Sequence, residues 1–419
     1  MGLESLVDEE LLEINLDNIR QQMLYVTYIT TEKNKRISKL YELRNATLFD
    51  DFPVETLFLT ENIPLDGEEQ FWQDWIEFLE YEAGDVAAQL LKEAILYKFG
   101  IERLILEAER HFLLHPSLFL VVLEELMKAT DFQRAATVGQ KALELIEPNI
   151  QLRSKIALIT AQANFHLSNM KEMQVAQKEV YRSYSTPENY LRLYLNADFP
   201  KEYRQVEENF TVVKNMYEYR LVGNKELEKN VLSSDSANNL RFLHGEFDYI
   251  LSISHNPPKS LGWSSNYIYQ GVHQFLLHLY SGNELGKATK SLASETASMY
   301  EFNHNKIYHY FDENKKPQSV DGSFAFERAF MNWKVEHPLS QEQKNHLLNW
   351  LEVTIEQRAK AIVGGGFRKH YAGVALLVIA LGEVKESLGM EHAKKETHEK
   401  YKKMFPRHRA FLAEMKEFL

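Results

Sequence analysis

Apolar residues recur along most of this chain at the three- and four-residue spacing that places them on one face of an α-helix. The first such stripe consists of Leu12, Leu16, Ile19, Met23 and Val26. It predicts an N-terminal helical segment over residues 8–45, although the run YVTYITT at 25–31 favours a β conformation. Pro53, Pro64 and Gly67 then predict an irregular crossing, so we assign residues 1–67 to an N-terminal helical segment.

The helical spacing continues in short paired segments from residue 68 to residue 222. The expected helices cover residues 68–82, 85–99, 101–115, 117–128, 130–148, 151–167 and 171–184. Thr186 followed by Pro187 is a start signal for a further helix, because the hydroxyl caps the first turn and proline fits the first helical position. We expect helices to about Val222 and assign 68–222 to a helical-repeat region.

The pattern changes over residues 223–264, where the turn-rich runs SSDSANN and HNPPKSLGW predict an irregular connector. Residues 265–419 are expected to form a C-terminal helical-repeat domain. In it, residues 267–280 predict a buried helix, 312–323 an exposed loop, and Ser340 with Gln343 a capping box before a helix to about Ile362. A closing helix over 407–419 carries Phe411, Met415 and Phe418 on one face and is expected to cap the stack on the preceding helix.

Residues 130–148 resemble the second helix of a tetratricopeptide-type repeat. Ala135 and Ala142 lie seven residues apart with Gly139 between them, so small side chains allow a neighbouring helix to approach closely. Such a helix pair cannot bury its apolar face alone and needs stacked neighbours. The fold expected is therefore all-α, an α-solenoid of stacked antiparallel helix pairs with degenerate tetratricopeptide-like repeats. Proteins with such repeats usually bind peptides or other proteins.

The amino-acid composition excludes several kinds of chemical site. The chain has 18 glycines and 11 prolines in 419 residues, which favours long helices with short turns, and it has no cysteine. Disulfides, cysteine-based zinc sites and thiol nucleophiles are thereby excluded. The N-terminus lacks the basic start of a secretory signal, and no run of 18 uncharged apolar residues occurs. These features predict a cytoplasmic protein without a membrane segment.

The charge is uneven along the chain. The formal net charge is −12, but residues 1–100 hold 21 acidic against 8 basic residues, whereas residues 351–419 hold 9 acidic against 13 basic residues. The overall charge disfavours wholesale nucleic-acid binding. One interpretation of the basic C-terminal end is a surface for an acidic partner, and the other is ordinary solvated helix faces.

No recognisable catalytic constellation occurs in the sequence. The run GGGFRKH at 364–370 either cradles a phosphate or forms a helix–helix turn, and it lacks the spacing of a P-loop. The pairs His273/His278 and His304/His309 are five residues apart, which on a helix points the rings in different directions. The many aromatic residues are expected either to fill the core between helices or to line a concave binding groove. We therefore expect no enzyme activity, no cofactor and no metal site.

Two C-terminal segments resemble a known family. They are SLGWSSNYIYQGVHQFLLHL at 260–279 and the region 368–419, with YAGVALLVIALGEVKESLG and FPRHRAFLAEMKEFL. Over roughly the last 160 residues they are similar to the helical tails of bacterial proteins that often carry a SWIM-type zinc finger. Because the chain has no cysteine, the finger is absent and its zinc and DNA roles do not transfer.

The resulting functional prediction is a non-enzymatic bacterial scaffold or adaptor that binds another protein along the concave face of a helical repeat. The alternative is an accessory subunit of a nucleic-acid-processing or defence system that contacts an acidic partner through its basic C-terminal end. A hydrolase or transferase without a recognisable motif is a third class. The candidate partner-binding residues are Arg368, Lys369, His370, Arg407, His408 and Arg409.

Overall fold

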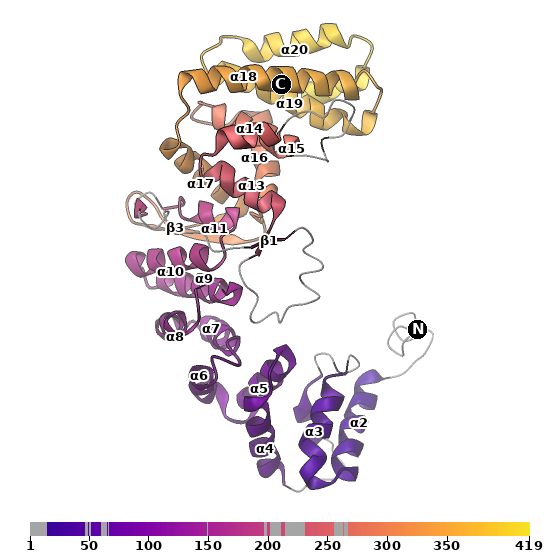
Figure 1. Cartoon of the computed structure of the whole chain (residues 1–419), viewed down its shortest axis with the longest axis vertical. Coiled ribbons are helices and arrows are strands. Elements are labelled where there is room, and N and C mark those ends of the chain that lie inside the picture. The colour runs from indigo at the N-terminus through magenta and orange to yellow at the C-terminus, as the bar shows by residue number, and fades with distance from the viewer. Residues whose placement is uncertain are drawn as a thin grey trace. The chain divides into compact units, whose positions relative to one another are not determined.

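The computed structural model describes residues 15–46, 49, 52–59, 65, 67–148, 150–196, 199–201, 211–213, 231–254, 263 and 267–419. Of these residues 72% are helical, in 19 α-helices and short 3₁₀ segments, which confirms the all-α prediction for the described chain (Figure 1). Described residues up to Asn169 form one compact unit, unit 1, and those from Met170 onward form a second, unit 2. Within the described ranges, no helix is both long enough and apolar enough to span a bilayer.

Unit 1 is entirely helical in its described part. Its elements are α2 (Leu16–Thr30), α3 (Lys33–Arg44), a 3₁₀ helix η2 (Val54–Phe58), α4 (Glu68–Tyr81), α5 (Asp85–Lys98), α6 (Gly100–Arg110), α7 (Leu118–Lys128), α8 (Phe132–Leu145) and α9 (Gln151–His166). From α4 onward these bounds follow the expected segments to within about three residues, except that α6 ends at Arg110, five residues before the end of the expected segment 101–115.

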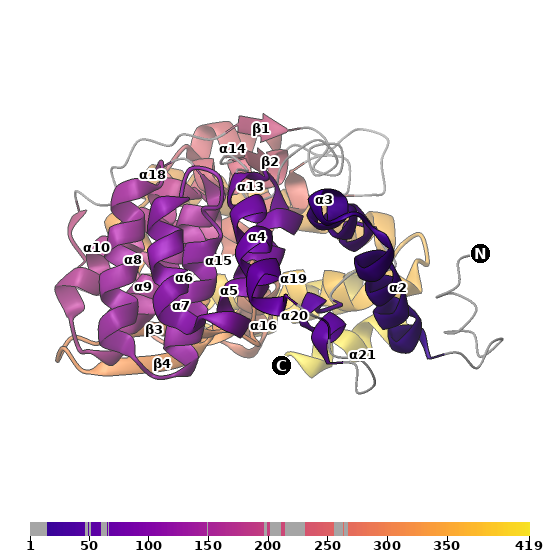
Figure 2. The ribbon, with the colours of Figure 1, turned by 90° about the horizontal axis from the view of Figure 1, so that it is seen from below.

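Each helix from α5 to α9 packs on the next, and α7 also contacts α9 (Figures 1 and 2). The closest approach is between α8 and α9. Ala135 and Ala142 are fully buried there, and a Cβ atom added at Gly139 would lie 2.0 Å from Oγ1 of Thr160. The small residues of 130–148 therefore do what the sequence predicts: they let the backbones of two neighbouring helices come together.

Aromatic rings attach α2 to the rest of unit 1. Tyr28 of α2 lies 5.8 Å from Phe58 of η2 and 5.7 Å from Phe71 of α4, between ring centroids. Phe58 and Phe71 are themselves 5.2 Å apart. Such pairs add about 0.5–1.5 kcal/mol each beyond the burial of their area. One face of α2 is thereby fixed against the unit, which leaves the opposite face outward.

Unit 2 contains the remaining elements. They are α10 (Met170–Ser183), α11 (Pro187–Arg192), β1 (Thr211–Val213), β2 (Val231–Ser233), α13 (Ser234–Leu243), α14 (Phe247–Ile253), α15 (Ile268–Leu279), α16 (Lys287–Met299), β3 (Ile307–Phe311), β4 (Pro317–Asp321), α17 (Gly322–Glu336), α18 (Gln341–Ile362), η5 (Arg368–His370), α19 (Tyr371–Ser387), α20 (Ala393–Met404) and α21 (Arg409–Glu417).

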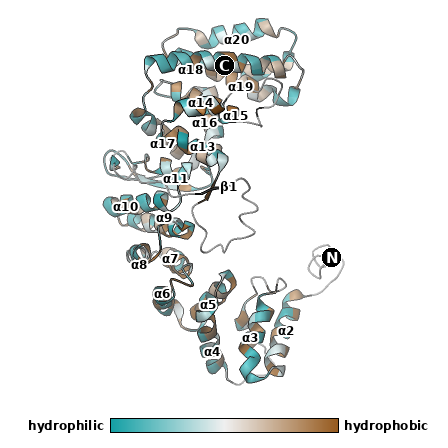
Figure 3. Ribbon diagram, in the orientation of Figure 1, coloured by the Kyte–Doolittle hydropathy of each residue, from teal (hydrophilic) through white to brown (hydrophobic). Residues whose placement is uncertain are grey.

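The core of unit 2 is organised around α19. Every residue from Val374 to Val384 in this helix is buried, and α15, α16, α18, α20 and α21 all pack against it. The outer helix α18 instead alternates hydrophilic and hydrophobic residues along its length (Figure 3). The predicted buried helix at 267–280 is confirmed as α15, in which ten of twelve residues are buried.

Two helix-terminus predictions are confirmed in this unit. Ser340 and Gln343 form the expected reciprocal capping box at the start of α18, which ends at Ile362. The closing helix docks as expected, since Phe411 and Met415 are fully buried. Its main partner, however, is α19 and not the preceding helix α20. The apolar stripe shows that the helix must be covered but does not identify the covering surface.

Several local predictions are wrong. Residues 312–323 are not a simple loop: β3 and β4 pair antiparallel, with Phe311 opposite Pro317 and a tight turn between them, and α17 begins at Gly322. The run SSDSANN does not form an irregular connector, because Ser233 caps α13 and the serines and asparagines continue as helix. Residues 211–213 form a strand parallel to β2 where helix is expected.

The N-terminal segment also differs from the sequence prediction. The expected helix over 8–45 is interrupted at Thr31 and Glu32, where the chain turns extended between α2 and α3. Its residues 8–14 lie outside the described residues, as do 202–210 and 214–222 of the expected helices and most of HNPPKSLGW. The boundary between the two compact units falls after Asn169, within residues 68–222.

Candidate partner-binding surfaces

The six basic residues predicted from the sequence lie in two short segments of unit 2. Arg368–His370 form η5 directly before α19, and residues 407–409 lead into α21. The ring of Phe411 in α21 lies 5.9 Å from that of Tyr371, the first residue of α19, so the two helix starts are adjacent. The structure thus gathers Arg368, Lys369, His370, Arg407, His408 and Arg409, which we call the basic cluster.

The basic cluster combines four cationic side chains with two helix starts. Neither α19 nor α21 has a side-chain cap or an acidic residue in its first turn, so two positive helix ends lie beside the basic side chains. Five of the six residues are exposed and His408 is half-buried. Among the described residues, none of the six forms an ion pair with an acid. This surface can attract an acidic group.

The adjoining glycine run belongs to the end of α18. A Cβ atom at Gly364 would lie 2.4 Å from the carbonyl oxygen of Lys360, and Gly366 has a positive φ of 76°. The backbone N–H of Phe367 then donates to the carbonyl of Ile362 over 3.0 Å, which closes the helix end. These contacts favour the helix–helix turn over the phosphate cradle as the interpretation of GGGFRKH.

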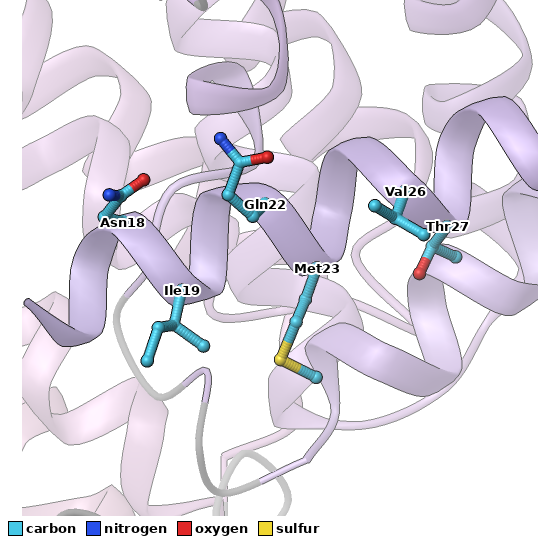
Figure 4. A pocket seen from close by; sticks show the side chains of 6 residues that line it. All are labelled: Asn18, Ile19, Gln22, Met23, Val26 and Thr27. Atoms are coloured by element: carbon cyan, nitrogen blue, oxygen red, sulfur yellow. The ribbon is translucent and has the colours of Figure 1, made fainter. Parts of the chain in front are cut away.

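A second surface lies on α2. Asn18, Ile19, Gln22, Met23, Val26 and Thr27 line an open groove of about 400 Å³ (Figure 4). Met23 is 37% exposed and Val26 is 50% exposed. Three apolar side chains at positions 19, 23 and 26 form a helical stripe, and we call this the outer face of α2.

The stripe of apolar residues predicts the helix but does not show which face of the helix stays exposed. The buried residues of α2 are Leu24 and Tyr28, on the other side of the helix. A helix with apolar residues on two sides buries one of them in its own unit and leaves the other available. The overlooked signal is a second apolar stripe, formed by Leu24 and Tyr28 four residues apart on the opposite side of the helix.

A third group of functional side chains joins α4 and α6. Nε2 of His111 lies 3.3 Å from Oε2 of Glu107 and 3.8 Å from Oε2 of Glu80. Burial and the neighbouring Glu107 raise the pKa of Glu80. Glu107 and His111 are four residues apart on one helix face, and this spacing is the sequence signal that the search for metal ligands overlooked.

The predicted histidine pairs are not brought together as ligands. His273 contacts Glu295 at 3.0 Å, and His278 hydrogen-bonds the carbonyl of His337 at 2.8 Å. His309 lies in β3, where its Nδ1 pairs with the hydroxyl of Ser319.

No family model matches this chain, and neither the curated proteins nor the solved structures compared with it provide a match.

Proposed function

We propose that the protein is a non-enzymatic helical-repeat adaptor and that the outer face of α2 binds an amphipathic helix of a partner protein. The observation that carries this proposal is the stripe of half-buried Ile19 and exposed Met23 and Val26 on a helix whose other face is anchored by aromatic packing. A stripe with this spacing matches the ridge of apolar side chains that another helix presents. Methionine suits such a surface because its flexible side chain adapts to the partner.

The proposal includes a tetratricopeptide-like solenoid in unit 1. It is supported by the succession of packed neighbours from α5 to α9, by the contact of α7 with α9, and by the small residues between α8 and α9. Helical repeats bury their apolar faces mainly against neighbouring repeats, so an apolar stripe left outside such a stack marks a surface for another molecule.

The proposal is tested by placing charge on the outer face. Met23→Glu combined with Val26→Glu introduces two carboxylates at exposed positions, so the fold is retained while an apolar partner is repelled. Affinity capture with the tagged chain, followed by mass spectrometry, is expected to recover a protein that the double variant no longer recovers. Purified partner and chain are then expected to bind directly, with at least a tenfold loss of affinity in the double variant.

The matched control is Gln133→Glu combined with Gln140→Glu, which adds the same charge to exposed positions of α8. This control is expected to bind like the wild type. Equal binding by wild type and the α2 variant would contradict the proposal, as would equal loss in both variants. If the wild type is a dimer and the α2 double variant is a monomer, the outer face of α2 binds a second copy of the chain and the proposal is contradicted.

A second candidate function is an accessory role beside an acidic partner, including a nucleic acid in a bacterial processing or defence system. It is favoured by the basic cluster and its two uncapped helix starts. Binding to duplex DNA should then fall steeply with salt, since phosphate contacts release counterions. Replacing Arg368, Arg407 and Arg409 by glutamine should reduce the salt slope by about three. Absence of DNA binding at low salt would exclude nucleic acid as the partner.

A further inference from the structure

Unit 1 brings two carboxylates and an imidazole to one point. Glu80 lies near the end of α4, Glu107 lies on α6, and His111 directly follows that helix. One ligand atom from each lies within 4.8 Å of the others, and among the described residues this is the only group of three such side chains with that geometry. The four-residue spacing of Glu107 and His111 is the one that lets two side chains of a helix face a single ion.

The distances suit a small tetrahedral ion. With metal–ligand bonds of about 2.0–2.2 Å, neighbouring ligand atoms of a tetrahedral site are separated by about 3.3–3.6 Å. The measured separations from Nε2 of His111, 3.3 Å to Glu107 and 3.8 Å to Glu80, lie close to this range. The separation between the ligand oxygens of Glu80 and Glu107 is at most 4.8 Å, and the Glu80 side chain is partly exposed.

Glu107 provides the observation that points to a ligand. Its side chain is only 1% exposed, yet within the described part of the chain its Oε2 atom accepts no hydrogen bond. The other oxygen, Oε1, pairs with Arg103 at 2.6 Å and with Arg110 at 3.1 Å. Both arginines therefore hold the carboxylate from one side and leave Oε2 turned toward His111, as outer groups orient a metal ligand.

The surroundings add rigidity and access. Nε2 of the buried His115 hydrogen-bonds the carbonyl of Leu79 over 3.0 Å, which fixes the chain next to Glu80. The side chains of Glu80 and His111 are 16% and 20% exposed, so an ion can enter from solvent and a water molecule can complete its coordination. Among the residues that the structure describes, Oε2 of Glu107 makes no hydrogen bond and has only the 3.3 Å contact with Nε2 of His111, so a cation bound between the two atoms would stabilise the buried carboxylate.

We propose that Glu80, Glu107 and His111 bind a divalent transition-metal ion, with Zn²⁺ as the best match. One imidazole and two carboxylates at tetrahedral spacing are typical zinc ligands, and water takes the fourth position. The ion joins α4 to α6 and stabilises unit 1 by binding the folded state alone. The sequence expectation of no metal site rested on the absence of cysteine and on the five-residue spacing of the histidine pairs. Neither observation concerns a site made of two glutamates and one histidine.

The test uses the full chain after removal of metal with EDTA and dialysis. Titration with ZnCl₂ in a calorimeter is expected to show one equivalent bound, and Co²⁺ is expected to give visible absorption bands of a four-coordinate site. Glu107→Gln should weaken Zn²⁺ binding at least tenfold while keeping the shape of the side chain. Zn²⁺ should also raise the melting temperature of the wild type but not of this variant.

The matched control is His273→Gln in unit 2, which removes a histidine that also contacts one glutamate, at 3.0 Å. It is expected to bind Zn²⁺ like the wild type. No stoichiometric binding by the wild type, unchanged binding in Glu107→Gln, or equal loss in the control would overturn the proposal, and the cluster would then be a structural ion-pair network centred on Glu107. If circular dichroism shows Glu107→Gln to be unfolded, the partly exposed Glu80→Gln gives the same test, again with at least a tenfold loss expected.

Discussion

Glu383 illustrates how single residues hold unit 2 together. Its buried carboxylate on α19 accepts hydrogen bonds from the backbone N–H groups of Ala288 and Thr289, at 3.3 and 2.8 Å. It also pairs with Lys394 at 3.0 Å. Because Gly286 gives α16 no side-chain cap of its own, Glu383 satisfies the free donors of that helix start from another helix.

Replacing this charge should weaken the fold. We expect Glu383→Gln to lower the free energy of unfolding by about 1–3 kcal/mol, since charge-assisted hydrogen bonds to a buried group are lost. Urea denaturation at pH 7.5 measures the change. The control Glu386→Gln, on the exposed face of the same helix, should stay within about 0.5 kcal/mol of the wild type. Equal effects of the two variants would show that Glu383 does not cap α16.

His278 makes the stability of unit 2 depend on pH. Burial lowers its pKa to about 3, and the nearby Lys334 adds to the shift. The unfolded chain titrates near pH 6.5. A depressed folded-state pKa means that the unfolded state binds the proton first, so the neutral ring contributes stability above pH 6.5 that is lost as pH falls toward 3.

The measurement compares His278→Gln with the wild type at pH 7.5 and pH 5. The variant should be the less stable protein at pH 7.5, because it lacks the contribution of the neutral His278 ring. It should lose less stability on acidification, because glutamine does not titrate. The contribution of His278 to the free energy of unfolding changes by up to about 1.4 kcal/mol per pH unit. The exposed His346→Gln serves as the control and should follow the wild type. A constant difference between His278→Gln and wild type at the two pH values would contradict the account.

At the residue scale, the sequence predicts which side chains are small, capping or basic, but not their distant partners. Gly139 and the Ser340 cap follow from local spacing alone. Glu383 is 94 residues from Thr289, and no local pattern predicts that the two meet. The basic residues were identified from composition, whereas their gathering depends on the packing of Phe411 beside Tyr371.

Among the elements, two helical glycines should respond to alanine with opposite signs. A Cβ atom at Gly139 meets Thr160, a β-branched residue whose hydroxyl is bonded to Ile156, whereas one at Gly373 meets open space. We expect Gly139→Ala to destabilise the protein by about 1–3 kcal/mol through overpacking. Gly373→Ala should stabilise it by about 0.5–1 kcal/mol through helix propensity. Chemical denaturation measures both, and stabilisation by Gly139→Ala would disprove the close approach of α8 and α9.

The closing helix α21 should be needed for stability. A chain truncated after Phe405 loses Phe411 and Met415, each worth about 1.5–3 kcal/mol when fully buried, and exposes the face of α19 beneath them. We expect a lower melting temperature and aggregation detectable by light scattering. Truncation after Phe418 removes only the half-exposed Leu419 and is the control. A melting temperature equal to that of the wild type would mean that α21 contributes nothing to the core.

Helices are predictable here because their signals are local, whereas the strands are not. Apolar periodicity, caps and prolines lie within one or two turns of the element they define. The hairpin of β3 and β4 depends on pairing between IYHYF and a polar partner, PQSVD, whose alternation is too weak to signal a strand. The break between α2 and α3 was missed because β-favouring residues around Thr31 were outweighed by the helical pattern.

At the scale of the whole molecule, the sequence predicts the all-α character of the described chain. Turn-rich composition suggested a boundary at 223–264, yet part of that region forms α13 and α14 inside unit 2. Which surfaces remain open is likewise decided by packing. The sequence alone does not distinguish the two apolar sides of α2. The contacts of Tyr28 with Phe58 and Phe71 show which side is buried.

The adaptor account depends most on the outer face of α2 meeting a partner helix. A photoreactive phenylalanine analogue at Met23 tests this in cells that naturally contain the protein, with the same analogue at the exposed Gln133 of α8 as control. The account predicts a crosslink from position 23 to a helical segment of one other protein, and none to that protein from position 133. A crosslink to a second copy of the chain, or no crosslink at position 23, would contradict it.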